Sequence, residues 1–270
     1  MSKLALAAAV ILCLASSTLA DDMHAPGDSV PVMRGVTYAA LLKQVVPDLK
    51  KSGDAWTGKK LPPIRHLLGK DYDNGAPDTL SVSQVASLKV RENGRDRLLV
   101  LTLDSNGDSW FALLAAFDDS KKPKLLDKAN VATDQMTGFY DRPVLHLANG
   151  SDAVFVSSGH FNSNQSYRIV TAFTLQNGSL QSAFDVFTLS DHACGYDRQQ
   201  DLSFAAKGSD IVAKVVETTT LTGEDCGEKP AVEKGTRIIT DTYRWDARKE
   251  RYFPTSKALE KLGKQNMDGL

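Results

Sequence analysis

Cysteine is scarce in this chain, which holds three among its 270 residues: Cys13, Cys194 and Cys226. No two of them form a Cys-x-x-Cys pair, so the spacing used by many zinc sites and redox-active dithiols is absent. Cys194 and Cys226 lie in the body of the chain, and two such cysteines pair readily in an oxidising compartment. We therefore predict a Cys194–Cys226 disulfide, to which catalytic or metal-binding thiols are the alternative.

Long hydrophobic runs are also lacking. The apolar run near the N-terminus covers residues 4–14, which is too short to span a bilayer; Lys3 precedes it, and small and polar residues ending at Ala20 follow. This order is typical of a secretory signal peptide. We expect cleavage after Ala20 and a soluble periplasmic or secreted protein with no membrane span. A lipid anchor at Cys13 is disfavoured because Leu12 precedes it where a small residue is needed.

An excess of basic charge is missing as well. Lys and Arg number 32 against 33 Asp and Glu, giving a net charge of −1 that becomes −2 when Lys3 leaves with residues 1–20. Proteins that bind nucleic acid neutralise phosphates with a basic surface, so we expect no nucleic-acid partner. Gly-x-Ser-x-Gly, His-Glu-x-x-His, Ser-x-x-Lys and Gly-rich phosphate loops do not occur either. No residue is therefore assigned a catalytic role.

What the sequence does contain is a repeated pattern. Gly-x-Asp recurs at Gly94, Gly150 and Gly208, at intervals of 56 and 58 residues. Phe117 and Phe173 each lie 23 residues beyond the first two of these glycines, and Trp245 lies 37 beyond the third. Strand-like runs between turn residues fill each interval. The pattern predicts a mainly β fold of three four-stranded antiparallel repeats, with the three aromatic rings at equivalent buried positions.

The expected organisation has three parts: the signal peptide (1–20), an N-terminal arm, helix and loop (21–80), and the repeated β domain (81–270). Thr37 can cap the helix. Its apolar residues follow at helical spacing: Tyr38, Leu41, Leu42, Val45 and Leu49. In the β domain, residues 97–103 and 110–117 are apolar at nearly every position, which is typical of strands covered on both faces. Residues 159–165 and 190–198 are expected as polar loops.

The sequence Tyr243-Arg244-Trp245-Asp246 before a charged turn, followed by Tyr252-Phe253, resembles the outer hairpin of β-propeller blades. Residues 104–108 also resemble the Asp-x-Asn-Gly-Asp loops of integrin-like propellers. The resemblance covers at most residues 81–253 and implies a propeller-like architecture. Three copies are fewer than propellers normally have, and the Asp-rich loop occurs once rather than in every blade. A β-sandwich or barrel of the same hairpins is the alternative.

Two metal sites are conceivable from residue types alone. Asp104, Asn106 and Asp108 have the alternate spacing by which oxygen ligands bind Ca²⁺, although a hairpin turn favours the same residues. His146, His160 and His192 could converge on zinc from adjacent repeats, but none is paired at metal-ligand spacing. We therefore expect the protein to need no cofactor, and calcium bound at residues 104–108 is the alternative.

The strongest polar cluster lies between the second and third repeats, at Asp191, His192, Tyr196 and Arg198. Together with His160, Asn162 and Asn164 these residues form the predicted ligand-binding face, because rigid β frames carry recognition on their loops. We interpret the protein as a secreted or periplasmic binding module for an unidentified ligand or envelope protein. The alternatives are an envelope hydrolase using Asp191, His192 and His160, and a structural envelope protein.

Overall fold

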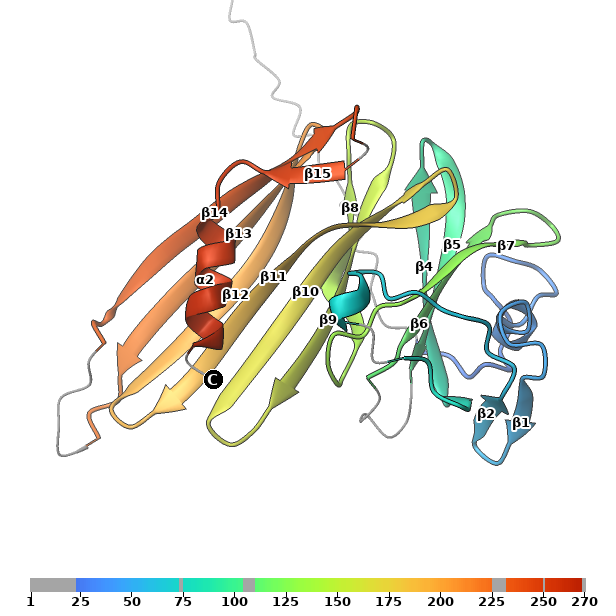
Figure 1. Cartoon of the computed structure of the whole chain (residues 1–270), viewed down its shortest axis with the longest axis horizontal. Helices are drawn as coiled ribbons and strands as arrows, with labels where there is room; N and C mark the ends of the chain where they lie inside the picture. The colour runs from blue at the N-terminus through green and yellow to red at the C-terminus, as the bar shows by residue number, and fades with distance from the viewer. Residues whose placement is uncertain (1–22, 73–74, 104–109, 225–231, 250, 269–270) are drawn as a thin grey trace, which may run out of the picture.

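Antiparallel strands dominate the computed structural model, which describes residues 23–72, 75–103, 110–224, 232–249 and 251–268 (Figure 1). The strands form three sheets, each in chain order. The three-stranded sheet contains β1 (Lys50–Ser52), β2 (Ala55–Gly58) and β3 (Leu80–Val82). The four-stranded sheet contains β4 (Gln84–Glu92), β5 (Arg95–Leu103), β6 (Leu113–Asp118) and β7 (Leu125–Asn130). The mainly β expectation is confirmed.

The third sheet has eight strands. They are β8 (Gly138–His146), β9 (Asp152–Phe161), β10 (Gln165–Gln176), β11 (Ser179–Ala193), β12 (Tyr196–Lys207), β13 (Asp210–Leu221), β14 (Gly235–Asp246) and β15 (Arg251–Pro254). The helices are α1 (Tyr38–Leu42), the short 3₁₀ helix η1 (Lys70–Tyr72) and α2 (Ala258–Met267). Neither α-helix of the described residues is long and apolar enough to cross a membrane.

The prediction of three four-stranded repeats is wrong in its grouping of strands. The first repeat does form a four-stranded sheet, but the second and third share the eight-stranded one, and none of the sheets is closed. The reason lies in residues 190–198, which we expected to be a loop. β11 and β12 continue through this segment and pair as a hairpin, which Gly195 turns with a φ of +88°. The hairpin joins the two repeats edge to edge.

The three Gly-x-Asp turns are hairpin turns, as predicted, and lie side by side. Gly94, Gly150 and Gly208 have φ angles of +75°, +80° and +67°, a region that glycine adopts without a steric cost. The amide of Gly94 donates to the carbonyl of Gly150 at 2.8 Å, and the amide of Ala148 donates to the carbonyl of Gly208 at 3.0 Å. These hydrogen bonds tie the turns into one row at one end of the strands.

The eight-stranded sheet curls so that strands far apart in its order face one another. Phe155 of β9 stacks on Phe204 of β12 with ring centroids 4.0 Å apart, and Phe184 of β11 stacks on Tyr243 of β14 at 3.5 Å. Tyr140 of β8 donates its hydroxyl hydrogen to the carbonyl of Leu202 in β12, at 2.7 Å. β8–β11 and β12–β15 are thus two walls with an apolar interior between them.

Helix α2 fills the opening between the two walls on one side (Figure 1). Its Leu259 and Leu262 join the apolar interior. β11 and β12 pair only over the three residue pairs nearest Gly195. Beyond them Asn266 of α2 inserts, donating to the Phe187 carbonyl at 3.3 Å and to the side-chain oxygen of Gln200 at 2.8 Å. Side chains therefore satisfy the backbone where the two strands separate.

The four-stranded sheet is covered on both faces, as the apolar runs predicted. On one face it packs against the N-terminal segment, where Phe117 is fully buried with Leu41 and Leu42 of α1. On the other it packs against β9 and β10, where Phe173 is fully buried. Thr37 caps α1 through the amide of Ala40, as predicted, but the helix ends earlier than expected and tight turns replace it before Pro47.

Three carboxylates join the two larger sheets, of which Glu92 and Asp152 are buried and Asp127 is partly exposed. Glu92 accepts from the amide of Gly178 in the β10–β11 turn, Asp127 accepts from the amide of Leu180 at 2.8 Å, and Asp152 accepts from the amide of Arg91 at 2.8 Å.

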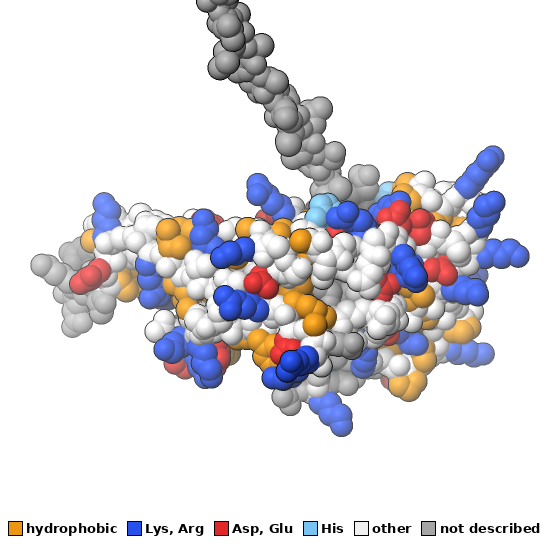
Figure 2. All heavy atoms as spheres, turned by 90° about the horizontal axis from the view of Figure 1, so that it is seen from above, with side chains coloured by type: hydrophobic (Ala, Val, Ile, Leu, Met, Phe, Trp, Pro, Cys, Tyr) orange, Lys and Arg blue, Asp and Glu red, His pale blue; other side chains and the backbone are white. Residues whose placement is uncertain are grey.

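Figure 2 shows basic side chains spread along the face seen from above, with acidic and apolar ones between them.

Candidate functional site

Two neighbouring hairpin tips carry the polar residues that the sequence singled out. β10 pairs with β11 so that Gln165 lies opposite Asp191, which places the β9–β10 tip beside the β11–β12 tip. The amide of His192 donates to the carbonyl of Asn164 at 2.7 Å, and the amide of Thr222 donates to the carbonyl of Gly195 at 3.0 Å. The seven predicted binding residues thus lie at one end of the sheet, in strands and tight turns rather than in loops.

Asp191 is held inside the β11–β12 hairpin. It lies directly across from Arg198, which donates through Nε at 2.7 Å and through Nη2 at 3.1 Å. The Tyr196 hydroxyl donates to the same carboxylate at 3.1 Å, and burial together with this carboxylate raises the pKa of Tyr196. Asp191 is buried, so its acceptor positions are occupied by its own hairpin. This geometry gives the cluster a structural role.

His192 does not work with Asp191, because successive residues of a strand point to opposite faces. Its Nδ1 contacts the carboxylate of Asp197 directly across the hairpin. Both side chains are about half exposed, at 54% and 51%. The hydrogen bond to Asp197 and the charge of that carboxylate raise the pKa of His192 above its ordinary 6.5. The pairing expected for a hydrolase, Asp191 with His192, is therefore not formed.

We expect Asp197→Asn to lower the pKa of His192 towards its ordinary value, because the substitution removes the carboxylate that stabilises the imidazolium. In the native protein the stabilising interaction is complete below pH 6.5 and is lost as pH rises through the raised pKa. NMR titration of the imidazole protons in the native protein and the variant measures the shift. An unchanged His192 titration would contradict the assignment of Asp197 as its partner.

His160, Asn162 and Asn164 divide between two roles. The Asn162 side-chain oxygen accepts from the amides of Asn164 and Gln165 at 2.9 and 2.8 Å, which shapes the β9–β10 turn. His160 lies opposite Tyr167 and stacks on it, with ring centroids 5.8 Å apart. The Tyr167 hydroxyl donates to Asp134, and burial and that carboxylate raise its pKa to about 12. A phenol in this state acts as a donor rather than as a base.

The structure bears on the zinc hypothesis but not on the calcium hypothesis. The described residues include no group of three or more His, Cys, Asp or Glu side chains that could hold a metal ion. His146 lies opposite Asp152 at the start of β9 and His160 near its end, about 25 Å away at the rise of a strand, so the predicted histidines do not converge. Asp104, Asn106, Asp108 and Cys226 lie outside the described residues, and the calcium site and the disulfide stay predictions.

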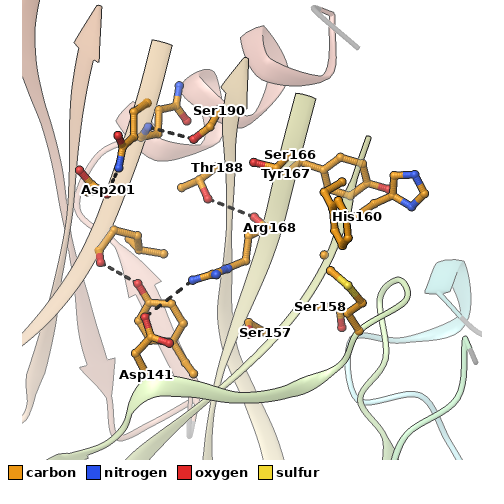
Figure 3. Close-up of a pocket in the computed structure, with 17 residues that line it drawn as sticks. Asp141, Ser157, Ser158, His160, Ser166, Tyr167, Arg168, Thr188, Ser190 and Asp201 are labelled. Atoms are coloured by element: carbon orange, nitrogen blue, oxygen red, sulfur yellow. Dashed lines mark hydrogen bonds and ion pairs between the residues drawn. The ribbon is translucent and has the colours of Figure 1, made fainter. Parts of the chain in front are cut away.

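A polar cleft of about 480 Å³ opens next to these hairpins, between β8–β11 and β12 (Figure 3). Its hydroxyl groups come from Ser157, Ser158, Ser166, Thr188 and Ser190. The Gln199 amide and the charged side chains Asp141, Arg168 and Asp201 also line it. Gln200 lies there too, but its side chain is bonded to Glu217 and Asn266. Of the predicted residues, only His160 lines it. The cleft therefore supplies closely spaced donors and acceptors, beside an apolar part that includes Met136, Phe161 and Leu202.

Arg168 is the cation of this cleft. It extends from β10 toward Asp141, and the rings of Tyr167 and His160 lie away from it (Figure 3). Its guanidinium is 3.9 Å from the Asp141 carboxylate and 5.7 Å from the centre of the Tyr140 ring, and half of the side chain is exposed. These are long contacts, so Arg168 can donate to a ligand without breaking a close ion pair.

No protein-family model, curated protein or solved structure matches this chain. Sequence reasoning missed Arg168 and the hydroxyl residues because they lie within strands, where only their spacing marks them. Ser166 and Arg168 alternate with apolar residues in β10, as Thr188 and Ser190 do in β11. That alternation is the signal of a polar sheet face.

Proposed function

We propose that this protein is an extracytoplasmic binding module that holds a small, hydroxyl-rich, uncharged ligand, such as a saccharide, in the cleft beside β12. The observation that carries the proposal is the composition of the cleft wall, where hydroxyl and amide groups surround Arg168. Ligand sites usually combine a preformed cavity with a few polar groups that fix the orientation of the ligand. The N-terminal segment and the cysteine pair support the location.

The charges of the cleft favour a ligand without net charge. Asp141 and Asp201 offset Arg168, so the cleft does not attract anions as a basic pocket would. Gln199 donates to Asp201 at 3.0 Å, and Ser190 accepts from the amide of Gln200 at 3.4 Å, which holds these side chains in place before a ligand arrives. Adjacent hydroxyls of a saccharide can donate to the carboxylates and accept from the guanidinium.

A ligand screen followed by one substitution tests this function. We expect neutral mono- and disaccharides to raise the melting temperature of the purified protein, and small carboxylates such as citrate to have little effect. Arg168→Ala should weaken saccharide binding about 10- to 100-fold by calorimetry, since a hydrogen bond from a charged group contributes about 1.5–3 kcal/mol.

The matched control is Arg142→Ala, which removes an exposed arginine of β8 that does not line the cleft. It should bind as the native protein does. Failure of every saccharide to bind, or equal affinity in the Arg168→Ala variant, would exclude the proposed ligand class. Preferential binding of citrate would replace it with an anion site.

A further inference from the structure

The outer edge of β14 is open over most of its length. β13 pairs with β14 from Thr219 opposite Gly235 to Ile211 opposite Tyr243. On the other side, β15 pairs only with the last four residues of β14, from Tyr243 onward. Within the part of the chain that the structure describes, no strand pairs with the remaining stretch of this edge, residues 235–241.

The direction of the free backbone groups follows from one hydrogen bond. The carbonyl of Thr242 accepts from the amide of Thr255 at 2.8 Å, so it points away from β13. In an antiparallel strand every second residue presents its amide and carbonyl to the same side. Thr240, Ile238 and Thr236 therefore also point their amides and carbonyls outward, as a ready template for another strand.

The outer edges of the four-stranded sheet and of β8 are covered or interrupted. β4 pairs with His24 through Val85, and β7 is bonded at Asn130 by the backbone of Arg65 and Leu67. β8 carries a proline and an irregular register between Phe139 and Val144. These are the usual means by which proteins prevent edge-to-edge pairing.

The open part of β14 has none of these protections. It contains no proline or lysine, and its register with β13 shows no bulge. The charge of Arg237 is matched by Glu217, to which its Nε and Nη2 donate at 2.6 and 3.0 Å, and Asp241 is buried. Ile238 is 65% exposed at the centre of the stretch. The unpaired backbone of this stretch, rather than the single apolar side chain, is what another strand can pair with.

We propose that β14 pairs with β14 of a second copy of this chain, antiparallel and centred on Ile238. In this register Ile238 lies opposite its own counterpart, and Thr236 lies opposite the partner's Thr240. Each of these pairs exchanges two backbone hydrogen bonds, and β-branched residues face β-branched residues across the junction. A twofold axis requires such self-complementary pairing. The result is one continuous sheet across two subunits.

Sedimentation velocity of the full-length mature protein over a range of concentrations tests the pairing. Because the shared surface is small, we expect a reversible dimer that dissociates in the micromolar range. Ile238→Lys should shift the midpoint to at least tenfold higher concentration, since it places two like charges opposite each other. The matched control, Leu221→Lys, changes another half-exposed apolar residue at the same end of the neighbouring strand β13 and should leave the dimer intact.

A charge-reversal pair separates this register from any other. Mixing Ile238→Lys with Ile238→Glu protein should restore association, while Ile238→Glu alone stays monomeric. Hydrogen exchange should slow at Thr236, Ile238 and Thr240 as concentration rises. A monomer at all concentrations, or a dimer unaffected by Ile238→Lys, would overturn the proposal. These outcomes do not depend on the cleft, so a failed ligand screen leaves them unchanged.

Discussion

Phe173→Ala should lower the free energy of unfolding by about 3–5 kcal/mol. The Phe173 ring is fully buried in the interface between the four-stranded sheet and β9–β10, beside Leu99, Leu101 and Val154. Removing it loses the transfer free energy of the ring and leaves a cavity between two sheets that other contacts hold apart. Urea unfolding monitored by circular dichroism measures the loss, which is a large part of the stability of a single domain.

The control for this substitution is Phe161→Ala at the tip of β9, where the ring is 65% exposed, and a small change is expected there. Trp245→Ala should cost less than Phe173→Ala, because Trp245 is only partly buried against the interior of the eight-stranded sheet. Equal losses at Phe173 and Phe161 would contradict the packing of the two larger sheets.

Asp191→Ala should destabilise the protein by about 3 kcal/mol. The substitution leaves Arg198 without its partner inside the hairpin, where the two side chains are 7% and 23% exposed, and breaking a buried pair by removing one member costs about 3–5 kcal/mol. Arg198→Leu in the same chain should restore part of the loss, because no unpaired charge then remains. Thermal and urea unfolding of the two variants provide the comparison.

Asp197→Ala is the matched control for Asp191→Ala, since it removes a carboxylate from the same hairpin whose partner, His192, is exposed. Its stability should stay close to that of the native protein. If Asp191→Ala unfolds like the native protein but loses saccharide binding, Asp191 is a ligand-binding residue after all, as the sequence suggested.

The turns were the most predictable part of the fold. Asn93-Gly94 and the glycines at 150 and 208 specify hairpins through their positive φ angles, which is a local property of the residues. The partner of each hairpin is not local. β11 and β12 pair through residues 190–198, whose charged and polar side chains resemble a loop because they lie on solvent-exposed strand ends. Sequence reasoning therefore found the hairpins and grouped them wrongly.

The candidate site was predictable to a similar degree. Asp191 and His192 do meet residues of the β9–β10 tip, because neighbouring hairpins end at the same level. Their internal pairing, Asp191 with Arg198 and His192 with Asp197, depends on which residues face each other across the hairpin. The cleft depends on the curl of the whole sheet, which brings β8 to β12. No local pattern encodes that approach.

The row of turns at Gly94, Gly150 and Gly208 gives the molecule one fixed end and one variable end. Inserting residues into any of these turns would break main-chain hydrogen bonds to its neighbour as well as its own hairpin. At the other end, the tip at Asn162–Asn164 is held mainly by its own turn and lies next to the cleft, whose lining includes Phe161 and Ser166, whereas Gly195 is also bonded to Thr222 and Glu224. Insertions, deletions and fused tags should therefore be tolerated at this end of the molecule. Substitutions there can change ligand specificity without disturbing how the two larger sheets are joined.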